Sequence, residues 1–486
     1  SSLGGPLAMA FAGLFGNQIE HAVAFNAPGF GNSASLATLF ATLGGRIPVA
    51  GNPLITNVVS SEEFLWWDGL QLISGFPFGS YPGKKVLVPI EDQFLGDVAD
   101  PKPHSFNHDQ RQVTDALTVF DLLQRLDPTM TLERFGVLLR GSANGQTRSL
   151  ENIVDAVEAV LGIDCAEMNA GNAYRDELHA AVQRIVGGAP AFPDPDRHFA
   201  AIAGTVAVLP LQRDLFAIAR DDFGMVAALQ DMGSLYLATP KTATAASRAR
   251  LDAMWRATRG ADYEAWLAYK ADAATGSFSE NWLRDRASMM QFIVEQNRGD
   301  IPAATVVQGS TDLQYMDLAS GRTVSVGTGI ELPGPGAAHV VFGGSSAAPL
   351  VGTGGNDRLY GSNATDDHLD GLAGNDLLEG GRGNDVYRFD AQFGHDTVHD
   401  LDGVGSIVLD GRSLRGGRAA GLADEWWGDG IDGATERYQL RDDARSATGK
   451  QLVVTRAGDA SNSIVIDHFD LATATTMLLD EMVDDD

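Results

Sequence analysis

The residues best suited to chemistry form a repeat rich in glycine and aspartate. Its first two units are Gly343-Gly-Ser-Ser-Ala-Ala-Pro-Leu-Val351 and Gly352-Thr-Gly-Gly-Asn-Asp-Arg-Leu-Tyr360, and three more follow, over 361–370, 371–379 and 380–388. The shared pattern is G-G-x-G-x-D-x-U-x, in which U is a large apolar residue. Glycines permit backbone angles that other residues resist, and Asp carboxylates and turn carbonyls are the hard oxygen donors that calcium prefers. The pattern therefore predicts calcium-binding turns joined by short strands.

Successive turns are expected to alternate between the two sides of a coiled sheet. Asp357 should then face Asp376, and Asp367 should face Asp385, with one calcium ion between the members of each pair. The predicted ligand set, with a further ion expected near its last member, comprises Gly354, Asn356, Asp357, Asp367, Gly374, Asn375, Asp376, Gly383, Asn384, Asp385 and Asp396. The first unit lacks its Asp and is interpreted as a cap without an ion. The U residues should stack inward, and they are Leu350, Leu359, Leu369, Leu377 or Leu378, and Tyr387.

This segment resembles the calcium-binding β-roll at the C-terminal end of secreted bacterial RTX proteins. The alternative is a flexible linker, but a linker has no reason to keep a nine-residue phase with an apolar residue in one position. The resemblance implies a parallel β-roll over 343–400 that binds Ca²⁺ and folds after type I secretion, in an extracellular location. It also implies a β-sandwich cap over 401–486, with strands near 406–410, 451–455 and 463–467. The end, Met477–Asp486, resembles a C-terminal secretion signal, and a plain acidic tail is the alternative.

A second candidate for chemistry is the N-terminal run Ser1-Ser2-Leu3-Gly4-Gly5-Pro6, which an apolar stretch follows. It resembles the nucleophile elbow, G-x-S-x-G, of α/β-hydrolase lipases. The resemblance implies that Ser2 is the nucleophile, that the Leu3 N–H is one oxyanion donor, and that Gly4 lets the following helix approach the sheet. The strand and oxyanion loop that precede such an elbow are not in this sequence. We therefore expect an N-terminally incomplete catalytic domain.

Hydrolases of this fold order their triad as serine, acid, histidine. The acid is expected just after the strand-like run 54–60, where Glu62, Glu63 and Asp68 qualify and Glu63 is preferred over Asp68. The segment around His108 resembles the one that carries the catalytic histidine in lipase-like domains fused to RTX repeats, and His104 is the competitor. His108 would accept the Ser2 proton during attack on an ester carbonyl, and water would release the acyl group.

The composition limits the classes of partner. The 486 residues carry a formal net charge of −29, which argues against nucleic acid or an anionic membrane surface as a partner. Over 351–486 there are 27 Asp and Glu against 11 Lys and Arg, an excess that cations would relieve. The single cysteine, Cys165, excludes an internal disulfide, and no apolar run is long enough to span a membrane. We find no phosphate loop, no zinc-ligand spacing and no basic patch.

These features indicate a multidomain chain. We expect a partial α/β-hydrolase domain over 1–130, a mainly helical segment over 131–308 and a strand-rich connector over 309–342, ahead of the roll. Aromatic residues near 255–269 could line an acyl pocket, although core packing is the simpler interpretation. The predicted function is a secreted, calcium-binding carboxylic ester hydrolase, a lipase or esterase. The alternatives are a non-enzymatic RTX surface or adhesion protein and, among enzymes, a phospholipase or polyester hydrolase.

Overall fold

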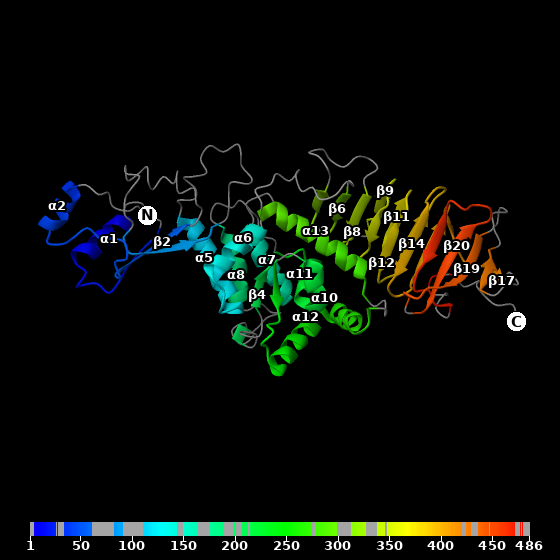
Figure 1. Cartoon of the computed structure of the whole chain (residues 1–486), viewed down its shortest axis with the longest axis horizontal. Helices are drawn as coiled ribbons and strands as arrows, with labels where there is room; N and C mark the ends of the chain where they lie inside the picture. The colour runs from blue at the N-terminus through cyan, green and yellow to red at the C-terminus, as the bar shows by residue number, and fades with distance from the viewer. Residues whose placement is uncertain are drawn as a thin grey trace. The chain divides into compact units, whose positions relative to one another are not determined.

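The computed structural model divides the chain into two compact units. One comprises Ser1–Arg213 and Gly224–Thr258, and the other comprises Asp214–Phe223 and Arg259–Asp486. Figure 1 shows their elements in chain order, from blue to red. The described residues are 4–25, 27, 34–60, 82–90, 110–142, 149–163, 175–187, 199–200, 207–211, 214–273, 278–298, 313–326, 338–345, 348–419, 424–428, 436–446, 448–471, 477 and 479.

The first unit begins with a small parallel sheet. Its strands β1 (Ala22–Phe25), β2 (Ile55–Ser60) and β3 (Lys84–Val88) pair in the order β1-β2-β3. Helix α1 (Gly4–Leu14) packs on β1 through Met9 and Ala12, and α2 (Ala34–Thr42) lies in the connection from β1 to β2. Parallel neighbours require such crossover connections, which explains why helices and strands alternate here.

Helices make up most of the described residues in the rest of the first unit. They are α5 (Gln110–Leu126), α6 (Leu132–Ser142), α7 (Ser149–Leu161), α8 (Asp176–Gly187), α11 (Phe223–Gln230) and the first part of α12 (Ala245–Ala271), which bends at Gly260. A short antiparallel pair, β4 (Ala207–Pro210) and β5 (Leu235–Ala238), interrupts the segment predicted to be mainly helical. One face of α5 is apolar and buried, with Val119, Leu122 and Leu123 fully enclosed. Its spacing of three and four residues places these side chains on one face of the helix.

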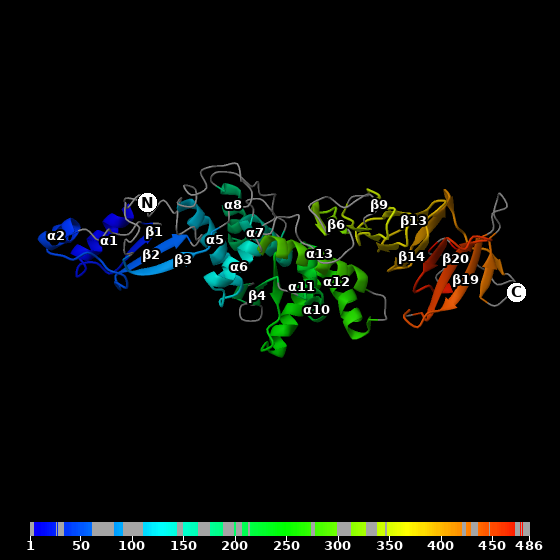
Figure 2. The ribbon, with the colours of Figure 1, turned by 45° about the horizontal axis from the view of Figure 1, so that its top comes forward.

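The second unit contains a parallel β-roll of two sheets. One sheet pairs β8 (Ala338–Phe342), β10 (Arg358–Tyr360), β12 (Leu377–Gly381) and β14 (His395–Asp400), all in parallel. The other pairs β9 (Leu350–Thr353), β11 (His368–Leu372), β13 (Asp385–Phe389) and β15 (Gly405–Leu409), also in parallel. Successive strands therefore belong to alternate sheets, as β13 and β14 do in Figure 2.

The core of the roll is the predicted inward stack. Its side chains are at most 1% exposed, and they are Leu350, Leu359, Leu369, Leu378 and Tyr387. The register aligns Leu359 with Leu378, and Leu369 with Tyr387, so each apolar side chain contacts its counterpart one coil away. Of the two leucines that the sequence left open, Leu378 is the inward one and Leu377 is half-buried.

The cap differs from the predicted β-sandwich. Strand β21 (Ser463–Ile466) pairs in parallel with β14, and β20 (Lys450–Arg456), β19 (Glu436–Asp442), β18 (Glu425–Trp427) and β17 (Arg418–Ala419) continue the same sheet in antiparallel order. The run 406–410, predicted to be a cap strand, belongs to the roll as β15, because Ile407 continues the inward stack beside Tyr387. At the opposite end of this sheet, the hairpin of β6 (Leu313–Asp317) and β7 (Arg322–Val326) precedes the first coil.

Among the described residues of the second unit, the helical segments beside the roll include α10 (Leu215–Asp221), the end of α12, and α13 (Glu280–Arg298). Helix α13 runs beside the larger sheet (Figure 1), where the hydroxyl of Tyr360 donates to Asp285 Oδ2 at 2.5 Å. The aromatic residues of α12 are core residues, because Tyr263 and Trp266 are buried and stack with centroids 6.0 Å apart. The core-packing interpretation of these aromatics is therefore the one that the structure supports.

Candidate calcium-binding site

The Asp residues of the roll form two rows, one on each side. In the first row, the Asp357 N–H donates to Asp376 Oδ1 at 2.7 Å, and the Asp376 N–H donates to Asp396 Oδ1 at 2.8 Å. In the second row, the Asp367 N–H donates to Asp385 Oδ1 at 2.8 Å. All five residues are buried. The structure therefore brings together both predicted pairs and adds Asp396 to the first row.

In two of these residues, Asp376 and Asp385, the second carboxylate oxygen is available to a cation. Asp376 Oδ2 and Asp385 Oδ2 are buried and accept no hydrogen bond from any described residue. Burial, with the charge of neighbouring carboxylates, raises the pKa of both Asp376 and Asp385 to about 7, and that of Asp396 to about 8. A buried carboxylate without a partner is costly, and a bound cation removes that cost.

Glycines bring backbone carbonyls close to these carboxylates. A Cβ on Gly374 would lie 2.0 Å from the Gly355 carbonyl oxygen, and one on Gly383 would lie 2.8 Å from the Thr365 carbonyl oxygen. Both glycines have a φ near +139°, which side chains strongly disfavour. Gly354 differs, since it has open space around its Cβ position and no positive φ. Carboxylates and carbonyls together are an all-oxygen donor set that fits Ca²⁺.

Comparison with known families agrees with this geometry. A profile of the RTX calcium-binding nonapeptide repeat matches the chain in four copies, over 342–367, 351–387 and 362–398. The chain carries an RTX roll. RTX nonapeptide repeats bind Ca²⁺, so calcium is the cofactor of this segment, and proteins with such repeats are typically secreted by type I systems. No curated protein and no solved structure matches the chain.

The side chains of Asn356 and Asn375 in the RTX roll link one turn to the next, and the predicted calcium ligation at Asn356, Asn375 and Asn384 stays a prediction. Asn356 Oδ1 accepts the Asn375 N–H at 2.9 Å, and Asn375 Oδ1 accepts the His395 N–H at 3.0 Å. In the ten-residue unit 361–370, Asp366 stands where the neighbouring units have an asparagine, and it accepts the Asn384 N–H at 2.8 Å. These side chains form a ladder that joins one turn to the next. They serve the spacing of the coils, and the Asp rows are the stronger candidates for ion binding.

Two acidic residues of the RTX roll were missed by the sequence pattern. Asp400 accepts the Tyr387 hydroxyl at 2.8 Å, and Asp402 accepts the Gly383 N–H at 3.1 Å. Both add negative charge beside Asp385, and burial raises the pKa of Asp400 to about 6. They extend the second row by one turn. The sequence feature that could have revealed them is Asp400-Leu-Asp402-Gly403, which has two carboxylates and a glycine but lacks the spacing of the repeat.

The predicted catalytic residues lie outside the described part of the chain. These are Ser2, Leu3, Glu62, Glu63, Asp68, His104 and His108. What the structure does describe is the helix after the predicted nucleophile. A Cβ on Gly5 would lie 2.2 Å from Ala27 Cβ, so Gly5 lets this helix lie close to the segment after β1. No described helix is long and apolar enough to cross a membrane.

Proposed function

We propose that this is a secreted calcium-binding protein whose RTX roll folds when it meets calcium outside the cell. The observation that carries the proposal is the pair of buried, unpartnered oxygens on Asp376 and Asp385. Without a cation, each row places carboxylates beside one another in a buried environment, which opposes folding. Binding energy then becomes folding energy, because the sites exist only in the folded roll. Low cytosolic calcium keeps the roll unfolded for type I export.

A calcium titration of the whole chain, followed by circular dichroism, tests this proposal. We expect a gain in β content between chelator and millimolar calcium in the wild type. The variants D376N and D385N should need at least about tenfold more calcium, because each removes a carboxylate from a row. D390N is the matched control, since Asp390 follows β13 with its side chain 56% exposed. Equal β content with and without calcium would overturn the proposal.

We further propose that the N-terminal part is a serine hydrolase acting on carboxylic esters, with Ser2 as nucleophile, His108 as base and Glu63 or Asp68 as acid. Support comes from the parallel strands β1, β2 and β3 that follow α1, since this alternation is the one expected after a nucleophile elbow. The close packing of Gly5 on Ala27 also fits a helix that must approach its sheet. The RTX roll would then serve to export and stabilise this enzyme.

Hydrolysis of p-nitrophenyl esters by the protein expressed from its complete coding sequence tests the second proposal. We expect activity in the wild type and a loss of at least about 1,000-fold in S2A and in H108A. Activity that persists in S2A would show that Ser2 is not the nucleophile. A wild type without activity on any acyl length would favour the non-enzymatic surface or adhesion protein. A panel of acyl chains and phospholipid head groups separates a lipase from a phospholipase or polyester hydrolase.

A further inference from the structure

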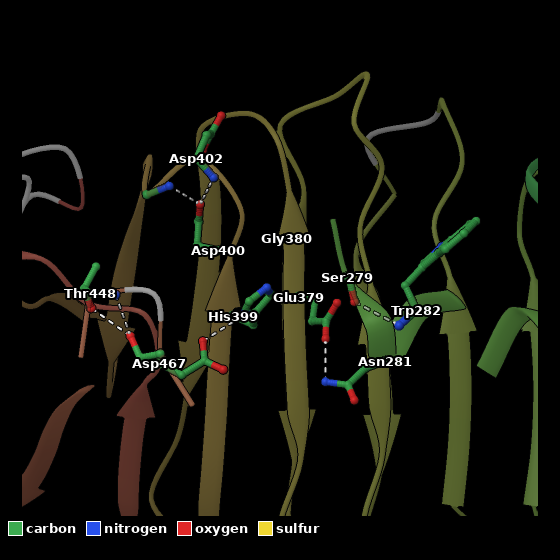
Figure 3. A network of polar contacts seen from close by, with 12 residues as sticks. Ser279, Asn281, Trp282, Glu379, Gly380, His399, Asp400, Asp402, Thr448 and Asp467 are labelled. Carbon is green, nitrogen blue, oxygen red and sulfur yellow. Dashed lines mark hydrogen bonds and ion pairs between the residues drawn. The ribbon is translucent and has the colours of Figure 1, made fainter. Parts of the chain in front are cut away.

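A second group of possible metal ligands lies where the RTX roll meets its cap. His399 is near the end of β14, and Asp467 and His468 form the turn directly after β21. His399 Nδ1 lies 2.8 Å from Asp467 Oδ1, and the rings of His399 and His468 meet edge to face with centroids 5.1 Å apart. One donor atom from each of the three residues lies within 4.8 Å of the others. Figure 3 shows His399 directed at Asp467.

We propose that His399, Asp467 and His468 bind a transition-metal ion such as Zn²⁺. Two imidazoles and one carboxylate are a common set of three protein ligands for zinc, with the fourth position left to water. Donor atoms around a tetrahedral zinc ion with bonds of about 2.0 Å are about 3.3 Å apart. The 2.8 Å contact between His399 Nδ1 and Asp467 Oδ1 is a hydrogen bond, so the ion would replace its proton and the two side chains would move slightly apart.

The surroundings of this His-Asp-His cluster offer room and charge for such an ion. A pocket of about 30 Å³ is lined by Asp467 and His468 but not by His399, and its volume is large enough for a water ligand. Asp400 lines the same pocket, and the buried Glu379 lies beside His399 (Figure 3). Both acids add to the attraction for a cation. Glu379 also accepts a hydrogen bond from Asn281 at 3.2 Å, which holds its carboxylate in place.

The proposed site differs in chemistry from the calcium rows. Calcium takes oxygen ligands, whereas imidazole nitrogen suits zinc and its neighbours in the first transition series. The ion would join β14, the last strand of its sheet within the roll, to the turn after β21, so it would tie the cap to the finished roll. Residues 399 and 467 are far apart in sequence, and a cross-link over such a span restricts the unfolded chain strongly.

The test uses the calcium-loaded whole chain, freed of transition metals with 1,10-phenanthroline, which leaves calcium in place. We expect one Co²⁺ per chain with the visible absorption of a four- or five-coordinate ion, displaced by Zn²⁺. The affinity for Co²⁺ should fall at least about 100-fold in H399A and in H468A. H395A is the matched control, because His395 lies on the same strand with its Nδ1 2.9 Å from Ser463 Oγ. It should bind Co²⁺ as the wild type does.

Thermal unfolding in saturating calcium gives a second reading that does not depend on the cobalt spectrum. Zn²⁺ should raise the melting temperature of the wild type and of H395A, and leave that of H468A unchanged. Circular dichroism in calcium shows whether each variant folds, and D467N replaces H399A if the latter does not. No cobalt uptake by the wild type, or equal uptake by folded H468A, would overturn the proposal. Neither result bears on calcium binding or ester hydrolysis.

Discussion

At the scale of single residues, the Asp rows determine how the RTX roll responds to acid. In the calcium-free fold the pKa of Asp376 and of Asp385 is about 7 and that of Asp396 about 8, against an ordinary value of 3.8. Burial is the main cause. Between the ordinary pKa of 3.8 and the raised values of about 7 to 8, the folded roll binds more protons than the unfolded chain does. The stability of the calcium-free roll therefore rises as the pH falls through this window, and it is lost as the pH rises.

We accordingly expect more β content in chelator at about pH 5 than at about pH 8, measured by circular dichroism. Calcium affinity should rise as the pH rises, because protons compete with calcium for the same carboxylates. Replacement of Asp376 by Asn should flatten the pH dependence of the calcium-free form. The exposed Asp390 serves as the control here too. A calcium-free roll that gains structure as the pH rises would contradict the argument.

The glycines of the turns provide a second test at this scale. Gly374→Ala places a Cβ 2.0 Å from the Gly355 carbonyl oxygen and imposes a φ of +139° on a residue with a side chain. We expect it to destabilise the calcium-bound roll by about 1–3 kcal/mol. The measurement is urea unfolding in saturating calcium. Gly354→Ala is the matched control, since a Cβ there meets nothing within 4 Å. Equal destabilisation by the two variants would refute the proposed role of the close contact.

At the scale of elements, helix α13 depends on the roll for its docking surface. The larger sheet presents Tyr360 to Asp285 of α13, and Arg358 pairs with the same carboxylate at 3.1 Å. Arg286 of α13 pairs with the buried Asp317 at 3.0 Å and lies over the Phe342 ring. Because these partners come from strands β6, β8 and β10, α13 gains these contacts only when the first coils have formed, whereas its packing on α10 does not require them. Calcium should therefore order α13 as well as the roll.

Hydrogen exchange of α13 checks this coupling. We expect calcium to increase its amide protection, and Tyr360→Phe to reduce that protection by about 1–2 kcal/mol, because the lost hydrogen bond is to a buried carboxylate. Tyr269→Phe is the control for the same chemical change. The Tyr269 hydroxyl, which lies on α12, donates to Glu280 Oε2 at the start of α13 at 3.1 Å. Protection of α13 that is independent of calcium would exclude the coupling.

At the scale of the whole molecule, all the calcium turns belong to the second compact unit. Chelation should therefore expose 338–419 to proteases and leave the first-unit helices α5 to α8 protected, since their core of apolar residues includes no Asp row. Limited proteolysis with mass spectrometry, with and without calcium, measures this difference. Loss of both units together in chelator would show that their stability is shared.

The sequence alone determined the features that depend on local spacing. A nine-residue phase fixed the alternation of turns, and with it the pairing of Asp357 with Asp376 and of Asp367 with Asp385. The position of the apolar residue in each unit fixed the inward stack. These are predictable because each follows from the geometry of a few consecutive residues.

Only the tertiary structure decided what depends on long-range register. The choice between Leu377 and Leu378, the continuation of the roll sheet into the cap, and the docking of α13 all follow from which strands pair. The His-Asp-His cluster is the clearest case. No sequence spacing links His399 to Asp467, and they meet because β21 pairs in parallel with β14. Strand β21 belongs to no repeat unit that would mark its partner, so only the folded sheet shows that it pairs with β14.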